Sequence, residues 1–127
     1  MNEKKHILIV EDEKALSHAL QIMLTAEWYD VTIAGDGEEG LLQIQAHPFD
    51  LILLDLIMPR MDGLTLLIRA KEKGKPYAAT PIIVLSNLGQ KEEIKKALAV
   101  GATDYLVKAN SPFPKVLDAI RRVLPAE

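Results

Sequence analysis

The chain has 127 residues, of which 49% are hydrophobic and 26% are charged, and its formal net charge is −3. These values are typical of one globular domain, exclude disordered and collagen-like chains, and give no reason to expect binding to nucleic acid or to a membrane. The sequence has no cysteine, which excludes disulfides and cysteine-bound zinc. It also has no signal-peptide pattern and no apolar run near the roughly 18 residues of a membrane helix, so we predict a cytoplasmic protein.

Five short apolar runs along the chain predict β-strands. They are His6–Val10, Asp30–Ala34, Leu51–Leu54, Ile82–Leu85 and Asp104–Val107. Four of these runs are almost entirely apolar, which is typical of parallel strands that are covered on both faces. The second run is more polar, so we predict that it lies at an edge of the sheet.

Helical periodicity fills the segments between these runs. We predict that Ser111 caps the last helix with Pro112 at its first position, that Gly74 and Pro76 end the third helix, and that Gly101 ends the fourth. The first and last helices have the spacing of one buried stripe each. In chain order, the apolar positions that mark the five helices are Leu16, Leu20, Met23 and Leu24; Leu41, Leu42 and Ile44; Leu64, Leu67 and Ile68; Ile94, Ala97 and Leu98; and Val116, Ile120, Val123 and Leu124.

The strict alternation of strands and helices predicts an α/β fold. Right-handed crossovers between parallel strands place helices on both faces of the sheet. We therefore predict a doubly wound (βα)5 architecture with a five-stranded parallel sheet, forming a single domain over residues 1–127.

Polar side chains follow four of the five predicted strands. Glu11 and Asp12 follow the first strand, Asp55 the third, Ser86 the fourth and Lys108 the fifth. Taken singly, most of these have an ordinary interpretation as helix-terminal charge, helix cap or solvated lysine. Asp55 does not, because apolar residues surround it and an unpaired buried carboxylate is costly. Since ligands bind at the carboxyl ends of parallel strands, the set as a whole favours a site.

The residue types in this set predict a particular chemistry. Glu11, Asp12 and Asp55 would repel one another and raise each other's pKa, and a hard divalent cation such as Mg²⁺ would relieve that repulsion. A cation with a lysine opposite and a hydroxyl nearby can hold a phosphoryl group during its transfer. Asp55 is then a candidate nucleophile, because carboxylates form aspartyl-phosphates.

Four segments of the sequence resemble the receiver domain of two-component response regulators, in particular the chemotaxis-regulator type. They are Ile7–Glu13, Asp55–Gly63, Pro81–Ser86 and Gly101–Lys108. The resemblance covers essentially the whole chain. It implies a flavodoxin-like sheet with strand order 2-1-3-4-5.

The resemblance also implies a phosphorelay switch rather than an enzyme with a separate substrate. Asp55 would accept a phosphoryl group from the phosphohistidine of a sensor histidine kinase or a histidine phosphotransfer protein. Glu11, Asp12, Asp55 and the backbone carbonyl of Ile57 would hold Mg²⁺. The domain would promote its own phosphorylation and also its own dephosphorylation, which would be slow.

The remaining implied roles concern the switch. Lys108 would pair with the phosphoryl oxygens and Ser86 would donate a hydrogen bond to one of them. Tyr105 would turn inward when Ser86 moves. The fourth helix, fifth strand and fifth helix would form the output face, which would contact a downstream effector protein, an output domain outside this chain or a second copy.

The chain departs from the family pattern at several positions. Asn87 replaces a smaller residue and would crowd the phosphoryl pocket. Ala109 replaces the usual proline after Lys108, yet we predict a cis Lys108–Ala109 bond, at a cost of about 3–4 kcal/mol. Neither Ile57 nor Leu88 can orient an attacking water, so we expect slow self-dephosphorylation.

Three other functions fit parts of the sequence. A nucleotide-binding domain of flavodoxin or dinucleotide type would need a glycine-rich turn after the first strand. The acidic segment Glu11–Glu13 stands there instead and would repel a phosphate, which argues against this alternative. A phosphatase of the haloacid dehalogenase type would have a second aspartate where Ile57 stands. A degenerate receiver would act as a phosphorylation-independent interaction module. Asn87 and Ala109 keep this alternative open, but it is disfavoured by the complete set Glu11, Asp12, Asp55, Ser86 and Lys108.

Overall fold

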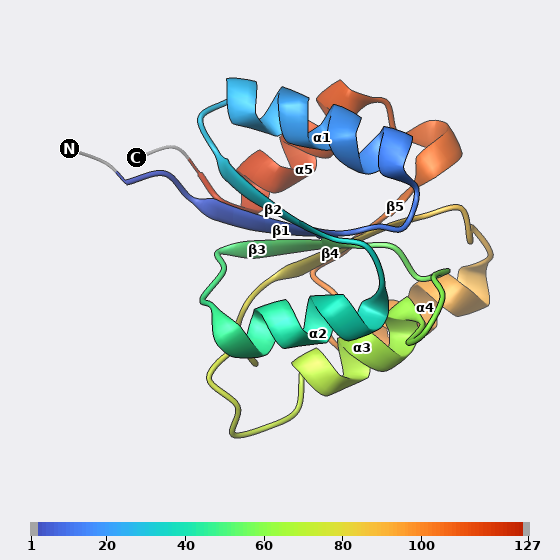
Figure 1. The fold of residues 1–127 in the computed structure, drawn as a ribbon. Coiled ribbons are helices and arrows are strands. Elements are labelled where there is room, and N and C mark those ends of the chain that lie inside the picture. Colours follow the sequence, from blue (N-terminus) through green and yellow to red (C-terminus); the bar gives the residue numbers. More distant parts are fainter. Residues whose placement is uncertain (1–2, 126–127) are drawn as a thin grey trace.

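The structure, a computed structural model, describes residues 3–125 and contains one five-stranded parallel sheet. The ends of the predicted 1–127 domain, residues 1–2 and 126–127, therefore lie outside the described residues. Residues 1–2 also belong to the N-terminal segment in which the sequence shows no signal-peptide pattern. The strands are β1 (His6–Val10), β2 (Asp30–Ala34), β3 (Leu51–Leu54), β4 (Ile82–Ser86) and β5 (Asp104–Val107). Their order is β2-β1-β3-β4-β5, which confirms the expected topology and places β2 at an edge (Figure 1).

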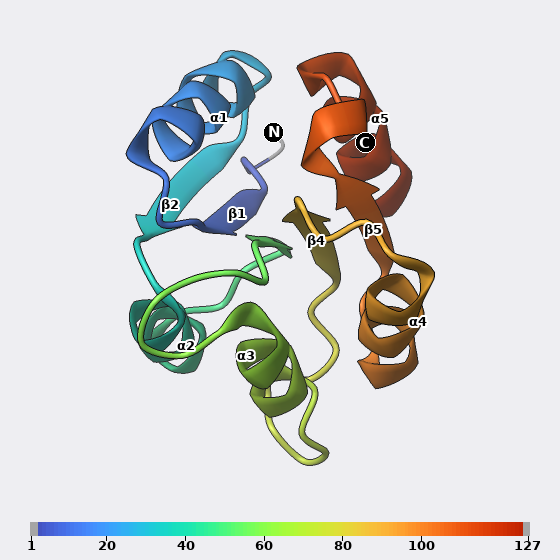
Figure 2. The same cartoon turned by 90° about the vertical axis from the view of Figure 1, so that its right-hand side faces the viewer.

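Helices cover both faces of the sheet, as predicted (Figure 2). One layer holds α1 (Lys14–Ala26) and α5 (Phe113–Val123), and the other holds α2 (Gly37–Ala46), α3 (Gly63–Ala70) and α4 (Lys91–Val100). A short 3-10 helix, η1 (Lys108–Asn110), joins β5 to α5. This is the doubly wound α/β fold that the sequence predicted.

Each strand contributes side chains alternately to two cores, because successive residues of a strand point to opposite faces. In β1, Ile7 and Ile9 pack in the core beneath α1 and α5, whereas Leu8 and Val10 pack in the core beneath α2, α3 and α4. All four are almost completely buried. Burial of each such side chain contributes about 1.5–3 kcal/mol, so this strand alone accounts for a sizeable part of the stability.

The ends of two helices differ from the sequence-based expectation. The structure begins α5 at Phe113 with Pro112 as its N-cap, so Ser111 does not cap the helix and its buried Oγ has no hydrogen-bond partner among the described residues. Two closely spaced prolines, Pro112 and Pro114, shape this first turn, and Pro112 takes an extended backbone. The third helix ends at Ala70, four residues before Gly74.

The segment that follows α3 is held by a lysine. Lys71 Nζ donates to the carbonyl oxygens of Thr80 at 2.5 Å and Ala78 at 3.3 Å, which closes a series of turns in place of further helix. Gly101, by contrast, ends α4 as predicted, with φ +132 in the left-handed region that favours glycine. Met23 departs from the predicted buried stripe of α1, since it is 39% exposed at the border facing α5.

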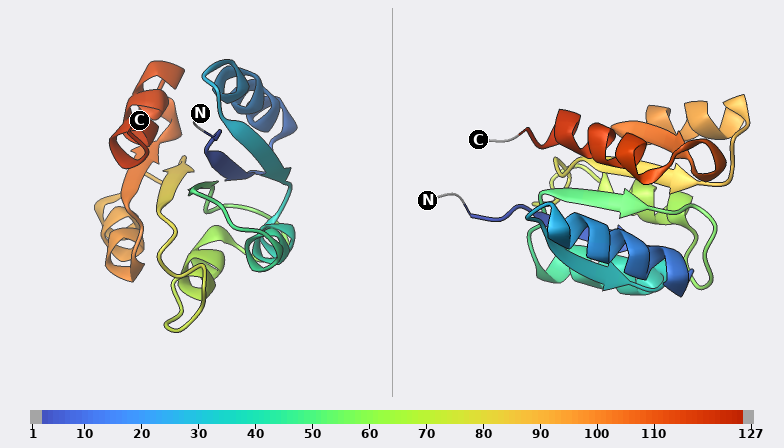
Figure 3. Two further views of the ribbon diagram at one scale, coloured as in Figure 1. Left: turned by 90° about the vertical axis from the view of Figure 1, so that its left-hand side faces the viewer. Right: turned by 90° about the horizontal axis from the view of Figure 1, so that it is seen from above.

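The strands all point the same way, so their carboxyl ends meet at one edge of the sheet. Figure 3 shows the two ends of the described chain at the opposite edge, near the start of the strands. The loops that follow β1, β3, β4 and β5 therefore gather together at the carboxyl edge, away from the chain ends.

Candidate functional site

An acidic cluster lies at the carboxyl edge of the central strands. Glu11 directly follows β1, Asp12 comes next, and Asp55 directly follows β3. One carboxylate oxygen from each of the three residues lies within 4.8 Å of those from the other two. Glu11 and Asp55 are buried and Asp12 is exposed, so the cluster combines desolvated oxygens with one that faces solvent.

Backbone hydrogen bonds place the two buried carboxylates. The Glu11 N–H donates to the carbonyl of Ala34, and the Asp55 N–H donates to the carbonyl of Val10, both at 3.0 Å. These bonds continue the pairing of β1 with β2 and β3 by one residue beyond the strands. The side chains of Glu11 and Asp55 therefore stand next to each other as a direct consequence of sheet register.

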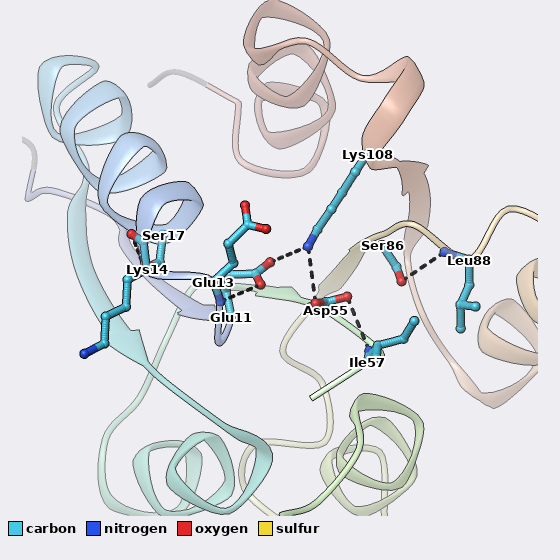
Figure 4. A network of polar contacts seen from close by, with 9 residues as sticks. All are labelled: Glu11, Glu13, Lys14, Ser17, Asp55, Ile57, Ser86, Leu88 and Lys108. Atoms are coloured by element: carbon cyan, nitrogen blue, oxygen red, sulfur yellow. Dashed lines mark hydrogen bonds and ion pairs between the residues drawn. The ribbon is translucent and has the colours of Figure 1, made fainter. Parts of the chain in front are cut away.

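Lys108 reaches into this cluster from η1, as Figure 4 shows. Its Nζ lies 2.8 Å from Glu11 Oε1 and 3.3 Å from Asp55 Oδ2. Burial alone would lower the pKa of the Lys108 ammonium, but the hydrogen bonds and negative charges of Glu11 and Asp55 outweigh it and raise that pKa above its ordinary value. Lys108 is therefore a charged, tethered cation between two carboxylates.

The Glu11 carboxyl experiences the opposite balance. Burial raises its pKa above the ordinary value, and this effect exceeds the lowering by the Lys108 ammonium and by the Glu13 N–H, which donates to Glu11 Oε2 at 3.0 Å. The nearby charge of Asp55 adds to the increase. The cluster sets three carboxylates against the single ammonium group of Lys108, which favours an additional cation.

The Lys108–Ala109 bond is trans, so the prediction of a cis bond is wrong. Residues 3–125 contain no cis peptide bond. The 3-10 turn of η1 carries Lys108 toward the carboxylates with an ordinary backbone, and its Nζ still contacts Asp55. The local geometry therefore does not require the roughly 3–4 kcal/mol cost of a cis bond before a non-proline residue.

Ser86 and Tyr105 meet at the backbone of Leu88, in the loop between β4 and α4. Ser86 is fully buried, and its Oγ accepts a hydrogen bond from the Leu88 N–H at 3.3 Å (Figure 4). The Tyr105 hydroxyl donates to the Leu88 carbonyl. Burial raises the pKa of the Tyr105 phenol. Sequence reasoning named both side chains but not Leu88 as their common partner, because a backbone group leaves no sequence signal.

A cavity of about 380 Å³ opens above the acidic cluster. It is lined by Glu11, Asp12, Glu13, Asp55, Ile57, Asn87 and Lys108. The Ile57 N–H donates to Asp55 Oδ1 at 3.4 Å, and Ile57, which lines the cavity, is 56% exposed. Carboxylate oxygens, an ammonium group and open space together suit a hard cation and a small anionic group.

Asp55 is also held by a close backbone contact with Gly63. The Gly63 N–H donates to the Leu56 carbonyl at 2.9 Å, and a Cβ at Gly63 would lie only 2.0 Å from the Asp55 carbonyl oxygen. Because that oxygen belongs to the backbone, it cannot move aside without displacing the start of the loop.

We expect Gly63→Ala to lower the free energy of unfolding by about 1–3 kcal/mol, the usual cost of inserting an extra carbon into a packed site. Urea denaturation of both proteins measures the difference. Gly35→Ala is the control, because its Cβ would meet only Glu39 Oε2, at 3.7 Å. That control should stay within about 0.5 kcal/mol of the parent. Equal stability of Gly63→Ala and the parent would contradict the tight packing around Asp55.

Comparison with known protein sequences identifies relatives of the whole folded region. The response regulator receiver domain family matches residues 7–121. The chain is 40% identical over 102 residues to the transcriptional regulatory protein DltR of Streptococcus agalactiae, covering 80% of this chain and 44% of that protein. It is 38% identical over 121 residues to the response regulator ArlR of Staphylococcus epidermidis, covering 94% and 52%. The chain spans about half the length of these relatives.

Solved structures with the same fold agree with this assignment. The chemotaxis protein CheY4 of Vibrio cholerae is 31% identical, with a TM-score of 0.86 over 94% of this chain and 98% of that chain. A chain of the CheX–CheY–BeF3–Mg²⁺ complex of Borrelia burgdorferi is 31% identical, with a TM-score of 0.88 over 98% of this chain and 92% of that chain. Among residues 3–125, no helix has the length and apolar character needed to span a membrane.

The family match extends from β1 into α5 and includes every residue that lines the cavity. The strand order 2-1-3-4-5 and the acidic cluster at the carboxyl edge agree with the resemblance inferred from the sequence. The chain therefore belongs to the receiver domain family of two-component response regulators.

Proposed function

We propose that the chain accepts a phosphoryl group on Asp55 from a phosphohistidine of a sensor histidine kinase or a histidine phosphotransfer protein. One Asp55 carboxylate oxygen attacks phosphorus, an O–P bond forms as the N–P bond breaks, and the imidazole leaves with its electron pair. The observation that carries the proposal is the placement of Asp55 beside two further carboxylates and the Lys108 ammonium, at the base of an open cavity.

Mg²⁺ is the cation that best suits this donor set. Glu11, Asp12, Asp55 and the backbone carbonyl of Ile57 would hold it, because oxygen ligands and an exposed side that keeps waters are what Mg²⁺ prefers. When bound, the cation would neutralise the charge that develops on the phosphoryl oxygens. The structure of the Borrelia burgdorferi relative, solved with BeF3 and Mg²⁺, supports the proposal.

The protein side chains have separate tasks in this step. Lys108 would pair with the phosphoryl oxygens, and Ser86 would donate a hydrogen bond to one of them. Lys108 Nζ lies 3.3 Å from Asp55 Oδ2, and Ser86 ends β4, the strand that pairs with β3 just before Asp55. These donors aim at the position where negative charge increases, which is how a preorganised site lowers the barrier.

Incubation with acetyl phosphate and Mg²⁺ tests the proposal directly. We expect the intact protein to gain the mass of one phosphoryl group, and we expect no gain when EDTA removes the cation. An absence of labelling with Mg²⁺ present would contradict the proposal and would favour a receiver that acts as a phosphorylation-independent interaction module.

The phosphorylated state is proposed to last long. Ile57 and Leu88 stand two residues after Asp55 and Ser86, and neither side chain can hydrogen-bond an attacking water. Ile57 is also an exposed apolar residue that lines the cavity. Slow self-dephosphorylation stays a prediction, as does the crowding of the phosphoryl group by Asn87.

The signal is proposed to leave the site through Leu88. Phosphorylated Asp55 would attract the Ser86 hydroxyl, which now accepts from the Leu88 N–H, and any movement of Leu88 would alter its hydrogen bond with Tyr105. The affected surface comprises α4, β5 and α5, where an effector protein, an output domain or a second copy would bind. The regulator names and greater length of the relatives support an output domain.

We expect Mg²⁺ and beryllofluoride, which mimics the phosphoryl group, to shift the NMR signals of Tyr105 and of the Lys91–Val100 helix as well as those around Asp55. Tyr105→Phe is the matched variant, since it keeps the ring and removes the hydroxyl that contacts Leu88. Its helix signals should respond less than those of the parent. Shifts that stay confined to the residues near Asp55 would contradict this route.

A further inference from the structure

An ion pair joins the start of α2 to the loop between β3 and α3. Arg60 Nε and Nη2 both donate to Asp36 Oδ2, at 3.0 and 2.8 Å. The other oxygen, Asp36 Oδ1, accepts from the Glu39 N–H at 2.8 Å and so caps α2. Asp36 is only 5% exposed, whereas the Arg60 side chain lies across the surface. A buried carboxylate thus ties two segments that are 24 residues apart.

The backbone at Arg60 has an unusual conformation. Its φ is +59, in the left-handed region that favours glycine, and Arg60 is one of two non-glycine residues among 3–125 with positive φ. Such a conformation costs free energy and persists where surrounding contacts determine it. The pair with Asp36 is the contact that holds this arginine, and the guanidinium in turn lowers the pKa of Asp36 after the larger effect of the Glu39 N–H.

The same loop carries one of the proposed ligands of the cation. Ile57, whose carbonyl would bind Mg²⁺, stands three residues before Arg60. The loop is fixed at its ends by the bonds of Asp55 and Gly63 to neighbouring backbone. In its middle it packs on α2 so closely that a Cβ at Gly37 would lie 1.9 Å from the Met61 carbonyl oxygen. The ion pair between Arg60 and Asp36 adds a second contact between this loop and the start of α2.

We infer that Asp36 and Arg60 are positioning residues for the cation site: they hold the loop that carries Ile57 beside the cavity lined by Glu11, Asp12 and Asp55. The inference rests on the proposed function, because it assumes that these groups bind Mg²⁺. Neither residue lines the cavity above the acidic cluster. Partners that orient metal ligands from outside typically change metal affinity by about 10–100-fold when they are replaced.

Two variants separate this role from general stability. Asp36→Asn keeps an oxygen to cap α2, since asparagine caps as well as aspartate, but removes the charge that faces Arg60. Arg60→Gly removes the guanidinium and leaves a residue that adopts φ +59 without strain. Glu38→Gln is the matched control, because the Glu38 carboxylate is exposed and lies 3.8 Å from Arg60 Nε.

The experiment is a Mg²⁺ titration followed by the amide NMR signals of Asp55 and Ile57, together with hydrogen exchange of residues 56–62. We expect Asp36→Asn and Arg60→Gly each to weaken Mg²⁺ binding about tenfold and to speed exchange in the loop, with no change in α5. The double variant should bind Mg²⁺ only slightly more weakly than either single variant, because both substitutions remove the same contact. Glu38→Gln should bind as the parent does.

The outcomes are distinct. Parent-like Mg²⁺ affinity in both variants, with a parent that binds Mg²⁺, would overturn the positioning role and leave the proposed function intact. A parent that binds no Mg²⁺ would overturn the proposed function and this inference with it. Weaker binding accompanied by faster exchange throughout the protein would also overturn it, because the effect would then be a loss of global stability.

Discussion

Asp55→Asn is expected to abolish phosphorylation by acetyl phosphate in the presence of Mg²⁺. The substitution replaces a carboxylate by an amide of nearly the same shape, which is a poor nucleophile and a weaker ligand for a hard cation. The packing around residue 55 should survive, because the backbone bonds to Val10 and the contact with Gly63 do not involve the changed atoms. Intact mass measurement should detect no phosphoryl group.

Asp62→Asn provides the matched control. Asp62 lies at the far end of the same loop, caps α3 through the Thr65 N–H at 2.8 Å and lines no part of the cavity above the acidic cluster. Asparagine preserves that cap. This variant should be labelled as fully as the parent. If Asp55→Asn is labelled as well as the parent, the assignment of the acceptor is wrong.

Lys108→Met is expected to strengthen Mg²⁺ binding while it destabilises the protein without the cation. The Lys108 ammonium occupies the same carboxylates that would bind Mg²⁺, so the two cations compete. The interaction energy of two unit charges 4 Å apart is about 4 kcal/mol at an effective dielectric constant of 20. We expect part of this energy to appear as tighter Mg²⁺ binding, about a tenfold gain in affinity, which a Mg²⁺ titration measures.

The loss of stability should depend on pH. Without Lys108, Glu11 and Asp55 are neighbouring buried carboxylates that lack a counter-charge, and removing one partner of a buried ion pair costs about 3–5 kcal/mol near neutral pH. Burial already raises the pKa of Glu11, and the loss of Lys108 would raise it further. A carboxyl whose folded pKa exceeds its unfolded pKa contributes most at low pH, so the deficit should shrink as the pH falls toward 4 and grow as it rises to 8.

Urea denaturation at several pH values, with and without Mg²⁺, measures this deficit. Lys71→Met is the matched control, since Lys71 is a partly buried lysine that donates to backbone carbonyls far from the acidic cluster. Its loss of stability should not respond to Mg²⁺. A Lys108→Met protein whose stability is unaffected by Mg²⁺ would contradict the competition between the two cations.

The acidic part of the site could be predicted from the sequence because it depends on little more than strand ends. In a parallel sheet covered on both faces, strands are continuous apolar runs, so their limits are visible in the sequence. Residues that directly follow neighbouring strands must then gather at one edge. Glu11 and Asp55 meet for this reason, one residue beyond β1 and β3. The order of the strands followed from resemblance to the family.

Contacts in the loops had no comparable pattern. Three features of the structure depend on how a turn packs in three dimensions. They are the trans bond after Lys108, the start of α5 at Phe113, and the Leu88 backbone that contacts both Ser86 and Tyr105.

The pairing of Asp36 with Arg60 was equally invisible, since it joins residues from two different loops and needs a left-handed backbone at Arg60. By itself the sequence determined the strands, the layers and the residue types at the carboxyl edge, because apolar periodicity encodes burial directly. Only the tertiary structure decided which polar atoms meet there, because hydrogen bonds between loops depend on positions to within a few tenths of an ångström.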